Sequence, residues 1–243
     1  MSASLVGSEM CIRDRDGVMI AYRSYLKSDN TMIDESLQNY IETRILPLYD
    51  GFDAAHQRNH AEMVIDQSIT IASEIDVDMD LVYTIAAYHD TGLTVDRKTH
   101  HLVSGKIVRE DRWLRDWFSE EQIETMAQAC EDHRASSDHE PRSIYGKIVA
   151  EADRFIDPDT IIMRTVQYGL ANYPELDKEG HWQRTIDHLH DKYAEGGYLR
   201  LWFENSPNAA RLNALREIIK NEQHLREKFD SLYETLSNPH LII

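Results

Sequence analysis

The sequence predicts an all-α protein, and two observations carry that prediction. Glycine and proline together supply only 16 of the 243 residues (10 Gly and 6 Pro), which leaves room for few turns. Charged residues (28%) and hydrophobic residues (42%) follow one another at helical spacing over most of the chain, and we find no alternating strand of useful length. We therefore expect a helical bundle with a polar surface and a core of its own.

Charge and hydropathy exclude several classes of partner. The chain has 26 Lys and Arg against 43 Asp and Glu, a formal net charge of −17, whereas binding a polyanion depends on cationic side chains that displace counterions. No run of about 18 apolar residues occurs, and two cysteines exclude a disulfide framework. We expect a cytoplasmic protein with no nucleic-acid and no membrane partner, either a monomer or a homo-oligomer.

The N-terminal segment differs from the rest of the chain. Residues 1–15 read MSASLVGSEMCIRDR, and SEMCIRD resembles the translation of a transposon adapter used in sequencing libraries. We therefore expect residues 1–31 to be non-native or disordered, with Met32 as a plausible true start and Cys130 as the native cysteine. A genuine disordered tail is the alternative interpretation.

Capping residues and helix breakers place the expected helices. Ser119, with two acids behind it, favours a helix start, Pro141 suits a first helical turn, and Gly92 separates two helical runs. We expect residues 32–170 to form one domain and residues 171–243 a helical extension packed on it. The expected helices span residues 34–48 (capped by Asp34 or Ser36), 60–74, 79–90, 99–110, 119–134, 141–156, 159–172, 181–203 and 207–236.

Four of these helices carry a polar residue on a face that is otherwise mostly apolar: His60, His89, His133 and Asp153. A buried acid is costly unless it is paired or bound to a metal. Together with Asp90, which follows His89, these residues form a set of imidazoles and carboxylates typical of a divalent metal centre in a helical core. The alternative is a buried His–Asp hydrogen-bond network that holds no ion.

The spacing of these residues resembles a known family. His60, the doublet His89–Asp90 in AAYHDTGL and Asp153 in AEADRF are similar to the H…HD…D signature of the HD-domain metal-dependent phosphohydrolases. The resemblance covers roughly residues 50–170 and is greatest to the stand-alone bacterial HD hydrolases. It implies an all-α HD fold, with these four residues as ligands of a primary divalent metal (Mn, Mg, Co, Ni or Fe).

The same resemblance also points to a site for a second metal. Some HD proteins add histidines at the positions of KTHHLVSGKIV and EDHRAS and hold two ions bridged by the HD aspartate. By that match His100 and His133 would be the added ligands, and His100 is preferred to His101 because the small residue Ser104 follows it by four positions. In the alternative, these histidines contact substrate phosphate or water and bind no ion.

The implied reaction is hydrolysis of a phosphate ester or anhydride in a nucleotide or small phosphorylated metabolite. Asp90, His133 and Arg134 are the expected catalytic residues, and a phosphate approaching so acidic a protein needs local cations. We expect Asp132 at a solvated helix position, with a role in orienting a ligand or as a base as the alternative. The expected substrate-binding residues are Arg97, Arg142, Lys147 and His56, with surface salt bridges as the alternative role for the cations.

Two other functions remain open at this point. HD proteins with the fuller histidine set include di-iron oxygenases that activate dioxygen, and His100 and His133 keep that interpretation available. The other is a binding module that holds a nucleotide without turnover.

Overall fold

The computed structural model describes the backbone of residues 8–13 and 19–24, and residues 33–52, 56–135, 137 and 139–237 in full. The chain divides into two compact units, the first ending at Asp153 and the second beginning at Arg154. Within the described residues no helix is both long and apolar enough to cross a membrane.

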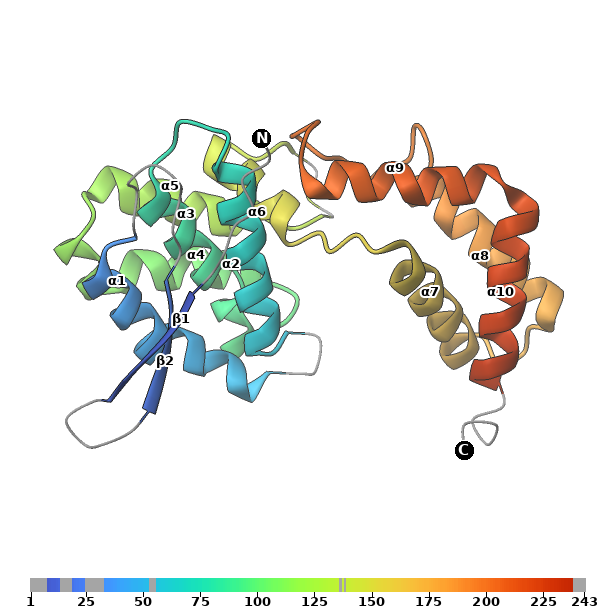
Figure 1. Ribbon diagram of the computed structural model, residues 1–243, viewed down its shortest axis with the longest axis horizontal. Helices are drawn as coiled ribbons and strands as arrows, with labels where there is room; N and C mark the ends of the chain where they lie inside the picture. The colour runs from blue at the N-terminus through green and yellow to red at the C-terminus, as the bar shows by residue number, and fades with distance from the viewer. Residues whose placement is uncertain are drawn as a thin grey trace. The chain divides into compact units, whose positions relative to one another are not determined.

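The first unit is helical, as the composition predicts (Figure 1). Helix α3 lies at its centre: it contacts α2, α5 and α6, and nine of its residues are buried. A helix that is apolar on every face is stable only when neighbours surround it. The helices of this unit are α1 (Glu35–Tyr40), the π-helix η1 (Ile41–Ile45), the 3-10 helix η2 (Leu46–Gly51), α2 (Arg58–Ala72), α3 (Met79–Tyr88), the 3-10 helix η3 (Thr91–Thr94), α4 (His100–Glu110), the 3-10 helix η4 (Arg112–Asp116), α5 (Glu120–Asp132) and α6 (Ile144–Ala152).

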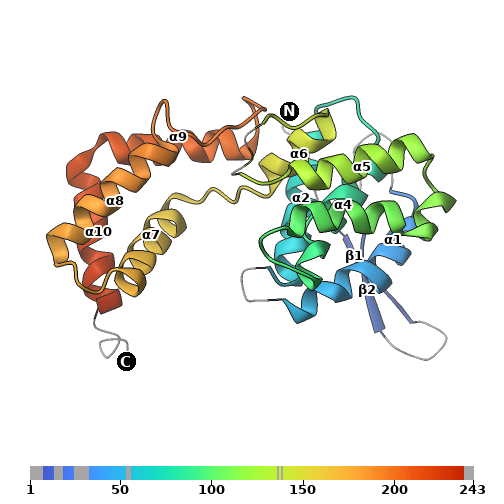
Figure 2. The same cartoon turned by 180° about the vertical axis from the view of Figure 1, so that it is seen from behind.

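Helices α4 and α5 lie side by side, as the view from behind also shows (Figure 2). Their contact matters for the site because α4 begins at His100 and His133 is the C-cap residue of α5. The core beneath is built of side chains such as Val64, Ile85, Met126 and Ile148, one from each of α2, α3, α5 and α6, all at most 1% exposed.

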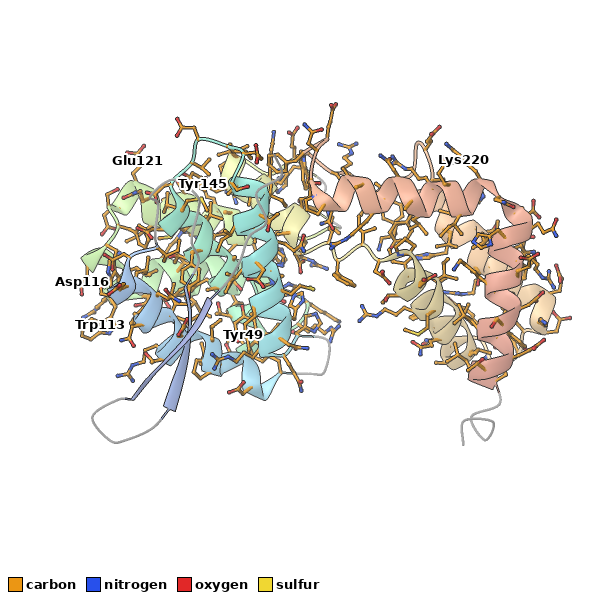
Figure 3. The ribbon with its side chains drawn as sticks, viewed as in Figure 1. Tyr49, Trp113, Asp116, Glu121, Tyr145 and Lys220 are labelled. Atoms are coloured by element: carbon orange, nitrogen blue, oxygen red, sulfur yellow. The ribbon has the colours of Figure 1, made fainter. Side chains whose placement is uncertain are left out.

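Tyr49, labelled in Figure 3, fixes the end of α3. Its side chain is completely buried. The hydroxyl donates to the Ala87 carbonyl at 2.9 Å and accepts from the Asp90 N–H at 3.2 Å. Two hydrogen bonds to buried backbone groups therefore hold the chain where the helix gives way to the His89–Asp90 doublet.

The second unit has a separate core. Its helices are α7 (Pro158–Asn172), α8 (Lys178–Tyr193), α9 (Pro207–Lys220) and α10 (Glu222–Ser237). Buried side chains from all four meet, among them Ile162, Trp182, Leu215 and Phe229. The boundary differs from the expected one at residue 170, because the apolar face of α7 packs on α8, α9 and α10.

Several helix ends differ from the sequence expectation. The first helix changes to π and 3-10 geometry after Tyr40, since Pro47 has no N–H to continue an α-helix. Ser143 rather than Pro141 begins α6, and that helix ends at Ala152 instead of residue 156. The helix expected over residues 181–203 ends at Tyr193, before the left-handed Gly196 (φ 83°). That expected over residues 207–236 is two helices separated at Asn221.

Two short strands, β1 (Ser8–Arg13) and β2 (Met19–Ser24), were not expected from the sequence. They pair antiparallel, with Ser8 opposite Ser24 and Arg13 opposite Met19. Neither SEMCIR nor MIAYRS alternates apolar and polar residues, so the hydropathy pattern gives no strand signal. Backbone pairing satisfies the N–H and C=O groups of both segments. The expectation that residues 1–31 are non-native stays a prediction.

Candidate metal centre

The HD doublet lies where α3 ends. His89 is the C-cap residue of α3 and Asp90 is the residue before η3. Both are buried, at 0% and 3% exposure. A bare imidazole and carboxylate in an apolar helical core need charged or hydrogen-bonding partners, and other helices of the first unit supply them.

The first cluster joins the doublet to the beginning of α2 and the end of α6. His60 Nε2 lies 3.1 Å from Asp153 Oδ1, 3.7 Å from Asp90 Oδ2 and 3.3 Å from His89 Nε2. His89 Nε2 in turn lies 3.4 Å from Asp90 Oδ2 and 3.8 Å from Asp153 Oδ1. Three segments that are far apart in the sequence therefore direct four ligand atoms at one point.

The second cluster joins Asp90 to the beginning of α4 and the end of α5. His100 Nε2 lies 3.2 Å from Asp90 Oδ1, and His133 Nε2 lies 3.5 Å from the same oxygen. The two imidazoles approach each other to 3.3 Å between their Nε2 atoms. The carboxylate of Asp90 thus faces the first cluster with Oδ2 and the second with Oδ1.

Backbone carbonyls orient three of the four imidazoles in the same way. The Nδ1 atoms of His89, His100 and His133 lie 2.7, 2.8 and 2.6 Å from carbonyl oxygens three residues earlier. A carbonyl can only accept, so in the neutral form of each ring Nδ1 carries the proton and Nε2 carries the lone pair. This is the arrangement by which proteins prepare histidine to bind a metal.

Charge and burial act in opposite directions on these groups. Burial alone would lower the pKa of His89, but the neighbouring carboxylates of Asp90 and Asp153 outweigh it and raise that pKa to about 9. Burial would raise the pKa of Asp90 and of Asp153, but the surrounding imidazoles hold both below their usual range. His100 differs, because burial dominates and lowers its pKa. The two carboxylates are therefore ionised at neutral pH.

The donor set fits a divalent metal. In the second cluster, two Nε2 lone pairs face each other at 3.3 Å beside a carboxylate oxygen, which is unfavourable without a proton or a cation between them. Ligand atoms bound at ~2.1 Å in octahedral geometry are about 3 Å apart, close to the separations found here. Two groups, His60–His89–Asp90 and Asp90–His100–His133, each hold their ligand atoms within 4.8 Å.

The sequence pattern left His100 and His101 open as ligands, and the structure separates them. His101 lies outside both groups, and burial together with the charge of Arg134 lowers its pKa to about 4. It lines a cavity of about 780 Å³ beside α4 and the end of α5. The ring of His56, expected to contact substrate, lies 5.7 Å from that of His60.

The cations expected to bind substrate have varied surroundings. Arg142 binds Asp132 and Glu131 at 2.8 and 2.7 Å, and Lys147 binds Glu140 at 2.5 Å. Arg134 donates to a backbone carbonyl instead. Arg97 is exposed on the loop before α4, and its role in binding substrate stays a prediction.

Two residues of this region were misjudged or missed in the sequence. Asp132, expected at a solvated position, is buried at 2% exposure and receives the Arg142 backbone N–H at 2.8 Å, because the segment after α5 folds back over it. Tyr49 was not recognised, since its contact with Asp90 joins residues 41 positions apart and no motif marks it.

A comparison with family models agrees with this geometry. Residues 58–156 match the HD domain, and the match contains all six histidine and aspartate residues of the two clusters. This part of the chain is an HD domain, so the resemblance inferred from the motifs is confirmed over that span. HD domains are generally metal-dependent hydrolases. No curated protein and no solved structure matches the chain.

Proposed function

We propose that this protein hydrolyses a phosphate ester or anhydride in a nucleotide or another small phosphorylated metabolite, with one or two divalent ions held by the HD domain. The observation that carries the proposal is the position of Asp90 between two three-residue ligand groups. Clusters of four imidazoles and two carboxylates suit Mn²⁺, Co²⁺, Ni²⁺ or Fe²⁺, and carboxylate oxygens also suit Mg²⁺.

The ligand atoms divide into two sets. His60, His89, Asp90 and Asp153 would hold the first ion; Asp90, His100 and His133 would hold a second. An ion bound there lowers the pKa of a coordinated water and polarises a phosphoryl oxygen. The backbone carbonyls behind His89, His100 and His133 keep the Nε2 atoms directed inward, so little reorganisation is needed on binding.

Arg134 is the cation best placed to act on substrate. It follows His133 directly and lines the adjacent cavity, and a guanidinium can bind phosphate oxygens in a bidentate way. Were the protein to hold a single ion, His133 would instead lie beside it as a proton-transfer residue. The two roles differ in what loss of His133 does to metal content.

The direct test is a hydrolysis screen. Purified protein stripped of metal and reloaded with Mn²⁺, Mg²⁺, Co²⁺, Ni²⁺ or Fe²⁺ is assayed against nucleotides and simple phosphate esters, with an Asp90→Asn variant prepared in parallel. We expect metal-dependent phosphate release that the variant lacks. Inactivity with every metal and substrate, or equal activity of the variant, contradicts the proposal.

A second candidate function has one observation in its favour. Four imidazoles around a carboxylate with both oxygens engaged also suit a pair of irons, as in the oxygenases of this superfamily. Anaerobic purification followed by iron quantitation and optical spectra separates the two functions. Two irons per chain with dioxygen-dependent spectral change would favour the oxygenase, whereas activity with Mn²⁺ or Mg²⁺ without dioxygen favours the hydrolase.

A further inference from the structure

The cavity beside the second cluster does not belong to the metal centre itself. None of the six candidate ligands lines it, although His101 and Arg134 do and each directly follows one of them. Its volume of about 780 Å³ is in the range of small-molecule sites. An occupant would therefore lie next to the metal centre but outside its ligand shell.

The carboxylates that line this cavity already have cationic partners. Asp132 is bound by Arg142, and Glu131 by both Arg142 and Arg109. Glu140 is bound by Lys147. Each acid that the structure describes on the cavity wall is thus paired with a cation. The same pairs commit Arg142 and Lys147, so neither cation is available to a ligand without breaking a pair.

Arg134 differs from those two cations. One guanidinium nitrogen, Nη1, donates to the Lys98 carbonyl at 3.0 Å, which is a neutral acceptor and fixes the side chain between the end of α5 and the loop before α4. Among the residues that the structure describes, no carboxylate oxygen lies within 4.0 Å of it. A guanidinium has five N–H donors, so Arg134 keeps both its charge and most of its donors for a ligand.

The wall also offers apolar surface. Leu102, on the same turn of α4 as His101, lines the cavity and is 53% exposed. The chain has a net charge of −17, but the described wall combines paired acids, the Arg134 guanidinium without a described carboxylate partner, and an exposed leucine. Such a wall favours an anion attached to an organic body.

We propose that this cavity is a subsite for a second anionic group of the substrate, bound by Arg134 while the reacting phosphate lies at the two ligand groups. The preferred substrate then carries two separate anionic groups, such as two phosphates, and contacts Leu102 with its organic part. The inference rests on the proposed function for the identity of the reacting group, but the subsite can be measured by binding alone.

Non-hydrolysable phosphonates provide the test. Binding of methylphosphonate, methylenediphosphonate and 1,3-propylenediphosphonate to the Mn²⁺-loaded protein is measured by calorimetry for the wild type and for Arg134→Gln, Arg134→Lys and Lys106→Gln. Lys106 is the matched control, because it is an exposed cation of α4 whose partner is Glu110 and it does not line the cavity. Circular dichroism and metal content verify that each variant is folded and loaded.

We expect the wild type to bind at least one diphosphonate more tightly than methylphosphonate. Arg134→Gln should lower the affinity for that diphosphonate by about 10- to 100-fold, the range for a charged hydrogen bond. It should lower the affinity for methylphosphonate by less than about threefold. Arg134→Lys should retain part of the preference, and Lys106→Gln all of it. An equal loss of affinity for methylphosphonate and the diphosphonate in Arg134→Gln, or a wild type that binds no diphosphonate more tightly than methylphosphonate, overturns the subsite. Failure of the hydrolysis screen with this pattern intact overturns the proposed function instead.

Discussion

Asp90 is the residue on which both ligand groups depend. Its Oδ2 faces His60 and His89, and its Oδ1 faces His100 and His133. The backbone N–H of the same residue is held by Tyr49, so the carboxylate is positioned from behind as well as from both sides. A substitution here removes one ligand atom from each group at once.

Asp90→Asn should therefore abolish binding of both ions, because an amide is neutral and a much poorer metal ligand than a carboxylate. Metal content measured by emission spectrometry should fall from the wild-type value to near zero, and phosphate release should be lost. The helical circular dichroism should persist. Wild-type metal content in this variant would show that the metal centre has been assigned to the wrong residues.

His133 distinguishes a two-ion from a one-ion site. We expect His133→Ala to lower metal content from near two ions per chain towards one and to reduce turnover by orders of magnitude. His190→Ala is the matched control, since that imidazole is exposed on α8 in the second unit and belongs to neither ligand group. Unchanged metal content with lost activity would instead make His133 a substrate or proton-transfer residue.

At the scale of elements, the second ligand group depends on how closely α4 approaches the turn after α3. The Gly92 N–H donates to the buried Ser104 hydroxyl at 2.9 Å. A Cβ on Gly92 would overlap the His100 carbonyl oxygen and lie 2.7 Å from the Ser104 nitrogen. Only a glycine therefore lets the first turn of α4 place His100 beside Asp90.

Gly92→Ala should displace the beginning of α4 and remove the second ion while the first is retained. Metal content should fall from near two towards one per chain, and the melting temperature should also drop because backbone atoms must move. Gly51→Ala is the control, since a Cβ there would meet nothing within 4 Å. Full occupancy of both ligand groups in Gly92→Ala would refute this role for the close approach.

A second contact between elements predicts a pH dependence. Tyr40 and Tyr88 both donate to Asp111 Oδ2, at 2.7 and 2.6 Å, and so join α1 and α3 to the end of α4. Burial, together with the hydrogen bond to Asp111, raises the pKa of Tyr40 from 10.0 to about 12. The fold favours the neutral phenol, so this stabilisation is complete below pH 10 and is lost as the pH rises towards 12.

The free energy of unfolding should accordingly decrease between pH 10 and 12, and the decrease should be smaller in Tyr40→Phe. Urea titrations at pH 9, 10, 11 and 12 measure both. At pH 9 the variant should be less stable by about 1 kcal/mol, the usual value of one hydrogen bond. The same pH dependence in both proteins would mean that Tyr40 does not contribute.

At the scale of the molecule, the metal ligands all belong to one of the two compact units. Every candidate ligand lies between His60 and Asp153, within the first unit, and the second unit has its own core around Trp182 and Phe229. Ligand binding stabilises the structure that binds, so metal should affect the units unequally.

Hydrogen–deuterium exchange with and without a chelator should reveal this difference. Removal of metal is expected to reduce protection in α2 to α6, because the candidate ligands lie at the ends of these helices and the helices would open more often. Protection in α7 to α10 should change little. An equal loss of protection in both units would show that they are stabilised together.

Much of the fold and of the metal centre could be predicted from local patterns. Helical spacing, the Ser119 cap and the apolar neighbours of His89, His133 and Asp153 are properties of short segments, and the helices that contain them are present. Helix ends were less predictable where a backbone detail decides them. Gly196 ends α8, and Asn221 divides the last helical run in two.

Contacts between distant segments had no such signal. A hydropathy pattern shows only which face of a helix is apolar, and it does not show which elements pack together. Packing decides the pairing of Arg142 with Asp132, the hydrogen bond of Tyr49 to Asp90 and the place of α7 in the second unit. The resemblance to the H…HD…D signature was thus enough to identify an HD domain and to name its candidate ligands. Which cations stay free for substrate, and how Asp90 divides its oxygens between two ligand groups, follows only from packing, because those distances join residues on different helices.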